Sequence, residues 1–170
     1  MNHPNTPIEL KATSASDSRL IEALLDGYLR ELSRHRDVPV GATNAASYPY
    51  LDTYWAEPGR HAFIIESDGQ AAGFALVRGP ASTGSAVHQL AEFYIKPESR
   101  RLGIGRRAMS EIWRRFPGQW ELQVHARNSA AAQFWSACAE TETGEAPQAR
   151  EVHARDGRRI QFSFRVGPAA

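Results

Sequence analysis

The chain has 170 residues, which is the usual size of one globular domain. Apolar residues make up 42% of the sequence and charged residues 23%, a balance that favours a buried core and excludes global disorder. The formal net charge of +1 argues against a dedicated nucleic-acid-binding protein, which usually carries a strong basic excess. One cysteine, Cys138, excludes an intrachain disulfide and a multi-cysteine metal site, so we expect no metal.

The N-terminus and the hydropathy pattern predict a cytoplasmic protein. The first residues lack the basic segment and apolar run of a signal peptide, and no run of about 18 apolar residues could span a membrane. Residues 1–7, with two prolines and two asparagines, predict a flexible tail. Residues 8–166 are expected to form a single domain.

Apolar periodicity and turn residues predict a mixed α/β fold, in the order strand, helix, helix, three strands, helix, strand, helix, two strands. Asp68-Gly69 and Asp156-Gly157 are each expected to lie in the turn of a β-hairpin. The predicted strands are residues 8–13, 61–67, 70–77, 87–95 and 119–126 and the two arms of 149–166. The predicted helices are residues 19–35, a short aromatic helix or turn within 48–58, 106–116 and 129–140, with loops at 36–47 and 79–85. We expect a mostly antiparallel sheet with one β-α-β unit near its middle, flanked by helices.

The segment from Arg100 to Arg107 (RRLGIGRR) joins a predicted strand to a predicted helix and is the most informative motif. Gly103 and Gly105 let the backbone approach an anion, and the first amides of a helix lack acceptors within it. Arg106 and Arg107 fall near the positive end of the helix dipole, where a bound anion would offset their repulsion. The segment predicts a pyrophosphate-binding turn, and the alternative is a tight turn with solvated arginines.

The spacing excludes the two best-known phosphate loops, because no Lys-Ser/Thr follows the second glycine and GxGxxG is absent. The remaining pattern, RxxGxG from Arg100 to Gly105, resembles the acetyl-CoA loop of the GNAT superfamily of N-acetyltransferases. The other matches are Phe93-Tyr94-Ile95 followed by Pro97-Glu98, and Asn128, Ala131 and Phe134 of an NxxAxxFY pattern. The segments DGYLRELS, GFALV and LAEFYI are similar to a group of uncharacterised bacterial acetyltransferases.

The resemblance implies both the fold and the co-substrate. In the GNAT fold the fourth and fifth strands splay apart to admit the pantetheine arm of acetyl-CoA. By this resemblance, backbone amides of the glycine loop hold the pyrophosphate, and the main chain of the fourth strand pairs with the pantetheine amides. The implied cofactor-binding residues are Phe93, Ile95, Arg100, Arg101, Leu102, Gly103, Ile104, Gly105, Arg106, Asn128 and Phe134. Asn128 is equally an ordinary helix N-cap.

Glu92 is the candidate general base. An ammonium acceptor must lose a proton before it attacks a thioester, and a partly buried carboxylate can take that proton directly or through water. A strand without a bulge would place Glu92 and Tyr94 on one face and Gln89, Ala91 and Phe93 on the other. A purely structural role for Glu92, or a base at His88 or His125, stays open.

The family's common tyrosine after Phe134, which protonates the leaving thiolate in many members, is Trp135 here. An indole N–H is not a working acid, so the general acid is undetermined. A thiol has a pKa near 8.5, so water, Ser136 or another tyrosine would suffice as the donor. We expect Cys138 to pack in the core rather than to act as a nucleophile.

The acceptor site of the family is usually lined by the first two helices and the loop between them. In this chain those segments supply aromatic and acidic side chains suited to a small cationic amine. The candidate substrate residues are Tyr28, Tyr48, Tyr50 and Asp52. The alternative is that these aromatic side chains only pack the short helix onto the sheet.

The sequence therefore predicts an acetyl-CoA-dependent N-acetyltransferase that acts on a primary amine of a small molecule or peptide. The amine is expected to attack the thioester directly in a ternary complex, without a metal or a covalent enzyme intermediate. The alternatives are an acyl-CoA-binding regulator without catalysis and a nucleic-acid module that uses the arginines of 106–115. The glycine loop would have no role in that module, so we expect no nucleic-acid partner. The oligomeric state is open between a monomer and a homodimer.

Charge is unevenly distributed along the chain. Residues 96–115 hold seven basic and two acidic residues, a net charge of +5, whereas the rest of the chain carries −4. One anionic cofactor explains this local excess better than a polyanion does. The acidic remainder is compatible with a cationic acceptor.

Overall fold

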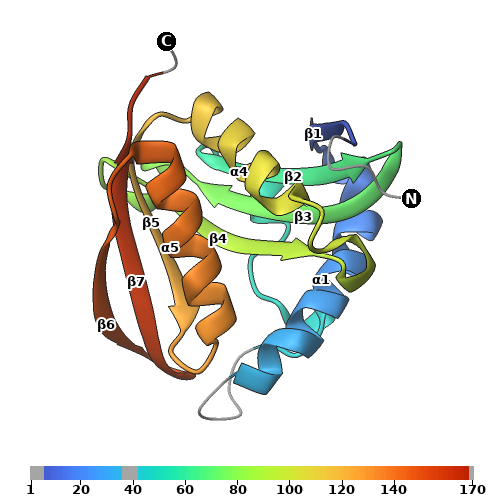
Figure 1. Cartoon of the computed structure of the whole chain (residues 1–170). Helices are drawn as coiled ribbons and strands as arrows, with labels where there is room; N and C mark the ends of the chain where they lie inside the picture. Colours follow the sequence, from blue (N-terminus) through green and yellow to red (C-terminus); the bar gives the residue numbers. More distant parts are fainter. Residues whose placement is uncertain (1–5, 36–41, 169–170) are drawn as a thin grey trace.

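The computed structural model describes residues 6–35 and 42–168 of the chain. Seven strands form one sheet in the order β1-β2-β3-β4-β5-β7-β6 (Figure 1). The strands are β1 Ile8–Ala12, β2 Arg60–Ser67, β3 Gln70–Arg78, β4 Val87–Ile95, β5 Gly118–His125, β6 Gln148–Ala154 and β7 Gly157–Val166. The helices are α1 Ser18–Leu32, α2 Thr53–Ala56, α3 Pro80–Thr83, α4 Ile104–Arg115 and α5 Ser129–Thr143. Short 3-10 turns lie at Ala15–Asp17, Ser33–His35, Ala45–Ser47 and Pro97–Ser99.

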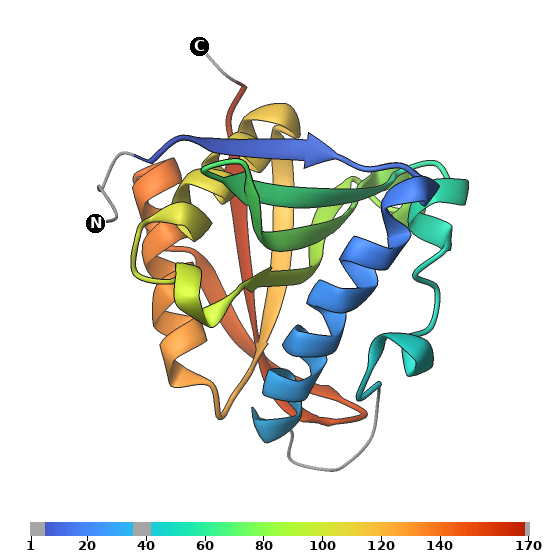
Figure 2. The ribbon, with the colours of Figure 1, turned by 90° about the vertical axis from the view of Figure 1, so that its right-hand side faces the viewer.

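The topology confirms the predicted mixed fold. All neighbouring strands are antiparallel except β4 and β5, which are parallel and are joined through α4. Helix α1 covers one face of the sheet, and α4 and α5 cover the other (Figure 2). Within the described part of the chain, no helix is both long and apolar enough to cross a membrane.

Two apolar cores hold these layers together, one on each face of the sheet. The larger core packs α4 and α5 on the sheet and includes the fully buried Trp113 and Trp120. The smaller core packs α1 and α2 on β2, β3 and β4, around Ile21, Leu25 and Phe74. The intervals of three and four between apolar residues of α1 are explained by this one-sided burial.

Several predicted boundaries differ from the structure. Helix α1 ends at Leu32 rather than at residue 35 and continues as a 3-10 turn. Helix α4 begins at Ile104 rather than at residue 106, because Gly103 takes a left-handed conformation (φ 72°) and ends the loop there. Helix α5 runs on to Thr143, where Gly144 caps it with φ 81°. The loop predicted at 79–85 contains α3. The closing hairpin turns at Arg155 and Asp156, since Ala154 pairs with Gly157. The predicted tail falls mainly, and the predicted loop at 36–47 partly, outside the described residues.

Strand β4 contains a bulge at Ala91, which overturns the predicted alternation of its side chains. Leu76 of β3 pairs with Glu92 while the next residue, Val77, pairs with Leu90, so Ala91 is an extra residue. Glu92 and Tyr94 do share a face, the one covered by α1. Gln89 lies on that face too, beside Arg78, and Ala91 packs against the α1 core, whereas Phe93 packs against the α4–α5 core.

Candidate active site

Strands β4 and β5 separate after a short parallel contact. They pair only from Val87–Leu90 to Gln119–Leu122, after which β4 stays with β3 and β5 stays with β7 (Figure 1). The backbone of β4 beyond Leu90 therefore has no strand on its β5 side. A cavity of about 150 Å³ opens at this divergence, and we call it the splay cavity. Its lining comes from β4 and β5, together with Tyr28 and Leu32 of α1, Asn128, Ala131 and Trp135 of the α5 segment, and Arg159 of β7.

The glycine loop lies at the start of α4. Its first helical hydrogen bond runs from the amide of Arg107 to the carbonyl of Gly103, so the amides of Ile104, Gly105 and Arg106 have no acceptor within the helix. Arg101 and Gly103 both have positive φ (63° and 72°). A Cβ at Gly105 would lie 3.2 Å from the Phe134 ring. Free amides beside a glycine that leaves no room for a side chain are what a close-bound pyrophosphate requires.

The arginines of this loop divide into two groups. Arg100 donates to both carboxylate oxygens of Glu31 (2.9 and 2.5 Å) and to the carbonyl of Ile95, which ties the loop to α1. Arg107 donates to the carbonyls of Leu102, Gly103 and Thr6 and so stabilises the conformation of the loop. Arg101 and Arg106 are exposed and remain the loop arginines that could reach an anion in solvent.

Replacing Arg100 with glutamine tests this division. We expect acetyl-CoA affinity to change less than about twofold, and the free energy of unfolding to fall by about 1 kcal/mol or less, as for other partly exposed ion pairs. Calorimetric titration and urea unfolding measure the two effects. A loss of affinity of tenfold or more would show that Arg100 contributes to binding the pyrophosphate.

Glu92 lies at the wall of the splay cavity, where tyrosines approach it. The hydroxyl of Tyr48 donates to Glu92 Oε1 over 3.1 Å. Burial raises the pKa of Tyr28 well above its usual value, and the charge of Glu92 and a hydrogen bond to it add to this rise. Burial, followed by the charge of Glu92, also raises the pKa of Tyr54, to about 12. These hydroxyls stay protonated at neutral pH, and those of Tyr28 and Tyr48 hold the carboxylate through hydrogen bonds.

Only part of the predicted acceptor set lies near Glu92. Tyr28 lines the splay cavity, and Tyr48 binds Glu92. Tyr50 is 68% exposed, and Asp52 lines a separate surface depression with Trp55. The predicted segments therefore supply two residues to this site, on the face of β4 that carries Glu92 and Tyr94.

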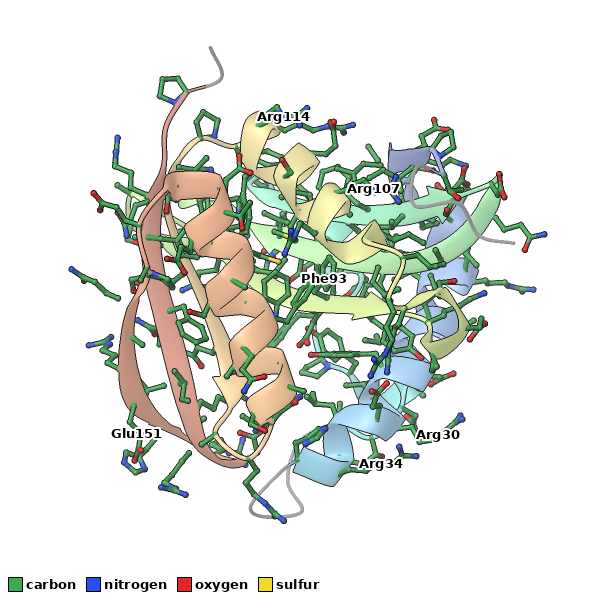
Figure 3. All side chains as sticks on the ribbon, viewed as in Figure 1. Arg30, Arg34, Phe93, Arg107, Arg114 and Glu151 are labelled. Carbon is green, nitrogen blue, oxygen red and sulfur yellow. The ribbon has the colours of Figure 1, made fainter. Side chains whose placement is uncertain are left out.

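Phe93 of β4 and Trp135 of α5 are the aromatic side chains that line the splay cavity together with Tyr28. Phe93 makes an edge contact with Trp135, with ring centroids 5.0 Å apart. It lies near the centre of the molecule, between α5 and α1 in the view of Figure 3. Asn128 caps α5 by accepting from the amide of Ala131 (3.1 Å), so the N-cap interpretation holds, and the residue also lines the cavity.

Sequence reasoning missed one cluster beside the cavity. Arg159 of β7 bonds both carboxylate oxygens of Asp156 at 2.8 and 2.9 Å, and His125 Nε2 lies 3.3 Å from Asp156 Oδ2. The Asp156-x-x-Arg159 spacing follows a hairpin turn and was a visible signal. Nothing in the sequence, however, shows that this end of β7 borders β5 and the cavity.

The charge of Asp156 is expected to contribute to stability. Burial alone would raise its pKa, but Arg159 and His125 outweigh burial, so the pKa lies below its usual value of 3.8. The stabilisation is therefore complete above that value and is lost as the pH falls through the lower pKa of the folded state. Asp156→Asn should cost about 1.5 to 3 kcal/mol at pH 7 and less at pH 3, measured by urea unfolding. An equal cost at both pH values would show that the charge is not involved.

Within the described residues, no group of three or more His, Cys, Asp or Glu side chains is arranged to hold a metal ion.

His88 and His125, the alternative bases, lie in different surroundings. The ring of His88 stacks on Trp120 (5.1 Å). His125 is buried against Asp156.

The sheet order and the separation of β4 from β5 are those that the resemblance to the GNAT superfamily implies. The model of the acetyltransferase (GNAT) family matches residues 20–139, and the chain belongs to this family of N-acetyltransferases, whose members use an acyl-CoA. No curated protein sequence matches the chain.

Solved structures share the fold at low sequence identity. An acetyltransferase from Thermus thermophilus has a TM-score of 0.67 and 15% identity, over 94% of this chain and 97% of that one. A Vibrio cholerae spermidine N-acetyltransferase in complex with CoA and spermine has a TM-score of 0.61 and 15% identity, over 94% and 95%. The Escherichia coli ribosomal-protein-S18-alanine N-acetyltransferase has a TM-score of 0.57 and 14% identity, over 96% and 97%.

Proposed function

We propose that this protein transfers the acetyl group of acetyl-CoA to a primary amine of a small molecule or peptide by direct attack in a ternary complex. The observation that carries the proposal is the splay cavity, which has Glu92 in its wall and the glycine loop at the start of the neighbouring helix α4. The family membership supports the acyl-CoA, and the similar structures include enzymes named for a small amine and for a protein substrate.

Acetyl-CoA would bind largely through the backbone. Amides from Leu102 through Arg106 would hold the pyrophosphate, with Arg101 and Arg106 adding charge from solvent. The pantetheine amides would pair with the main chain of Phe93 and Ile95, on the side of β4 that lacks a strand. Asn128 would donate its amide N–H to the same arm, and Phe134 would pack beside Gly105.

Glu92 would act as the general base. It would take a proton from the acceptor ammonium, directly or through water, so that the free amine attacks the thioester carbonyl. The nitrogen–carbon bond then forms, and the carbon–sulfur bond breaks with its electron pair leaving on sulfur. Backbone amides on the β5 side of β4 beyond Leu90 would stabilise the oxyanion that develops on the carbonyl oxygen.

The leaving thiolate needs no strong acid, because a thiol has a pKa near 8.5. This fits Trp135, which cannot donate a proton as the family's tyrosine does. Among the described residues that line the splay cavity, Tyr28 is the tyrosine that could supply this proton, because its raised pKa keeps its hydroxyl protonated.

We propose the cytoplasm as the location, since the buried Cys138 forms no disulfide and requires no oxidising compartment.

Two measurements test the proposal. Calorimetric titration with acetyl-CoA should show binding in the micromolar range, and a thiol-release assay over amino acids, polyamines, aminoglycosides and peptide N-termini should show turnover with at least one class. Binding without turnover on any class would favour the regulator that the sequence left open. Absence of acetyl-CoA binding would contradict the proposal.

A further inference from the structure

A second groove adjoins the splay cavity along β4 and β5. It has a volume of about 180 Å³ and shares Leu90, Ala91, Leu122, Gln123 and Arg159 with the splay cavity. Its remaining lining is polar and comes from Arg78, Gln89 and Glu121. We call it the acceptor groove. Two arginines and two glutamines dominate it, which is an unusual lining for a site that binds a polycation.

Arg159 is held rigidly where the two hollows meet. Three of its contacts go to Asp156 (2.8 to 3.1 Å), and Nη1 makes a longer contact of 3.4 Å with Gln123 Oε1. Its side chain is nevertheless 29% exposed and lines both hollows. A guanidinium fixed on one edge by a buried carboxylate presents its other edge with little further loss of entropy.

Arg78 has no carboxylate partner among the described residues. Its guanidinium donates to the hydroxyl and carbonyl oxygens of Ser82 (3.2 Å each) and to Gln89 Oε1 (3.4 Å), all of which are neutral acceptors. The side chain is half-buried at the end of β3. A half-buried cation with only neutral contacts gains most from an anion that enters the groove.

We propose that the acceptor amine carries a carboxylate, as amino acids do, and that Arg159 and Arg78 bind this carboxylate while Glu92 receives the amine. The inference rests on the proposed function and adds the substrate class. Glu92 and Arg159 line the same cavity of about 150 Å³, so one small zwitterion can reach both. A polyamine would set its additional ammonium groups against both arginines, and only Glu121 in the groove lining and Asp156 behind Arg159 would offset part of that repulsion. The cationic acceptor predicted from the sequence is replaced here by a zwitterionic one.

Matched acceptor pairs test the proposal with acetyl-CoA and the whole chain. Each pair consists of an amino acid and the amine left by its decarboxylation, and spermidine is included as a polycation. For the best pair, kcat/KM should be at least about tenfold higher with the carboxylate, the effect of one charged hydrogen bond. A decarboxylated amine or spermidine as the best acceptor would overturn the proposal.

Two substitutions connect this preference to the arginines. Arg78→Gln should reduce the preference severalfold, and Arg159→Gln should bring it near one, where the preference is the ratio of the two kcat/KM values measured with the same variant. Arg159→Gln leaves the buried Asp156 without its arginine partner and could therefore fail to fold. Arg78→Gln removes only contacts with neutral groups, so it keeps the test valid in that case. Arg158→Gln is the matched control, since Arg158 is an exposed neighbour on β7 that lies 3.7 Å from Glu151. A preference that survives both groove substitutions would contradict the assignment.

Calorimetry separates this inference from the proposed function. If acetyl-CoA binds and amines without a carboxylate are acetylated as fast as amino acids, only the substrate class is wrong. If acetyl-CoA does not bind, the proposed function itself fails, and the substrate class fails with it.

Discussion

Glu92→Gln is expected to lower kcat by a factor of about 10² to 10⁴, the usual contribution of a general base. Glutamine keeps the shape of the side chain and an oxygen that can accept from Tyr48, but it cannot take a proton at neutral pH. The KM for acetyl-CoA should stay within about twofold, because Glu92 lies on the face of β4 that α1 covers, where the acceptor is proposed to bind. Steady-state thiol release over a range of amine concentrations gives both values.

Glu66→Gln is the matched control for this prediction. Glu66 is a partly buried strand carboxylate on β2, and β3 separates it from β4. Its substitution should leave kcat unchanged. An unchanged kcat in Glu92→Gln, with the protein folded, would give Glu92 the structural role that the sequence left open and would move the search for the base to bound water.

Gly103→Ala is expected to weaken acetyl-CoA binding by about five- to thirtyfold. Alanine at φ 72° costs about 1 to 2 kcal/mol, and the loop can relieve this strain by turning its amides away from the binding orientation. Gly105→Val should weaken binding further, because its side chain would collide with the ring of Phe134. Calorimetric titration of both variants measures these losses.

Gly84→Ala provides a control with the same backbone strain. Gly84 has φ 71°, nothing lies within 4 Å of its added Cβ, and it follows α3, away from α4. Both alanine variants should lose similar thermal stability, and only Gly103→Ala should lose acetyl-CoA affinity. Equal affinity in the two variants would mean that the loop does not bind the pyrophosphate.

Local sequence signals predicted most of the fold. Asp68-Gly69 closes the β2–β3 hairpin with positive φ at both residues (55° and 71°), as a type I′ turn requires. The bulge at Ala91 could not be predicted, because it depends on how β4 pairs with β3. The bulge sets the faces of the residues before it, since without it Leu90 and Glu92 would share a face.

The loop motif could be predicted, but the partners of its arginines could not. The net charge of +5 over residues 96–115 indicated an anion site, yet several of these arginines have structural partners. Arg100 binds Glu31, Arg107 binds loop carbonyls, Arg114 pairs with Glu111, and Arg115 donates to the carbonyl of Leu10. Figure 3 shows Arg107 and Arg114 near opposite ends of α4. The contacts of Arg100 with α1 and of Arg115 with β1 join segments far apart in the sequence and depend on the tertiary packing, which composition does not encode.

The acceptor groove could not be predicted from the sequence, for a related reason. Arg78 and Arg159 lie near the ends of two strands and are 81 positions apart in the sequence. They line one groove only because β3, β4, β5 and β7 are consecutive in the sheet. The aromatic and acidic cluster of residues 48–55 was a stronger sequence signal, but much of it packs or is exposed away from the groove.

Hydrogen–deuterium exchange with and without CoA tests the central claim most directly, because the claim concerns two stretches of backbone. The amides of Leu102 through Arg106 have few acceptors within the chain, and β4 from Ala91 to Ile95 lacks a strand on its β5 side. We predict that saturating CoA slows exchange in both segments and leaves the β6–β7 hairpin unchanged. Protection elsewhere, with no change in these two segments, would contradict the account.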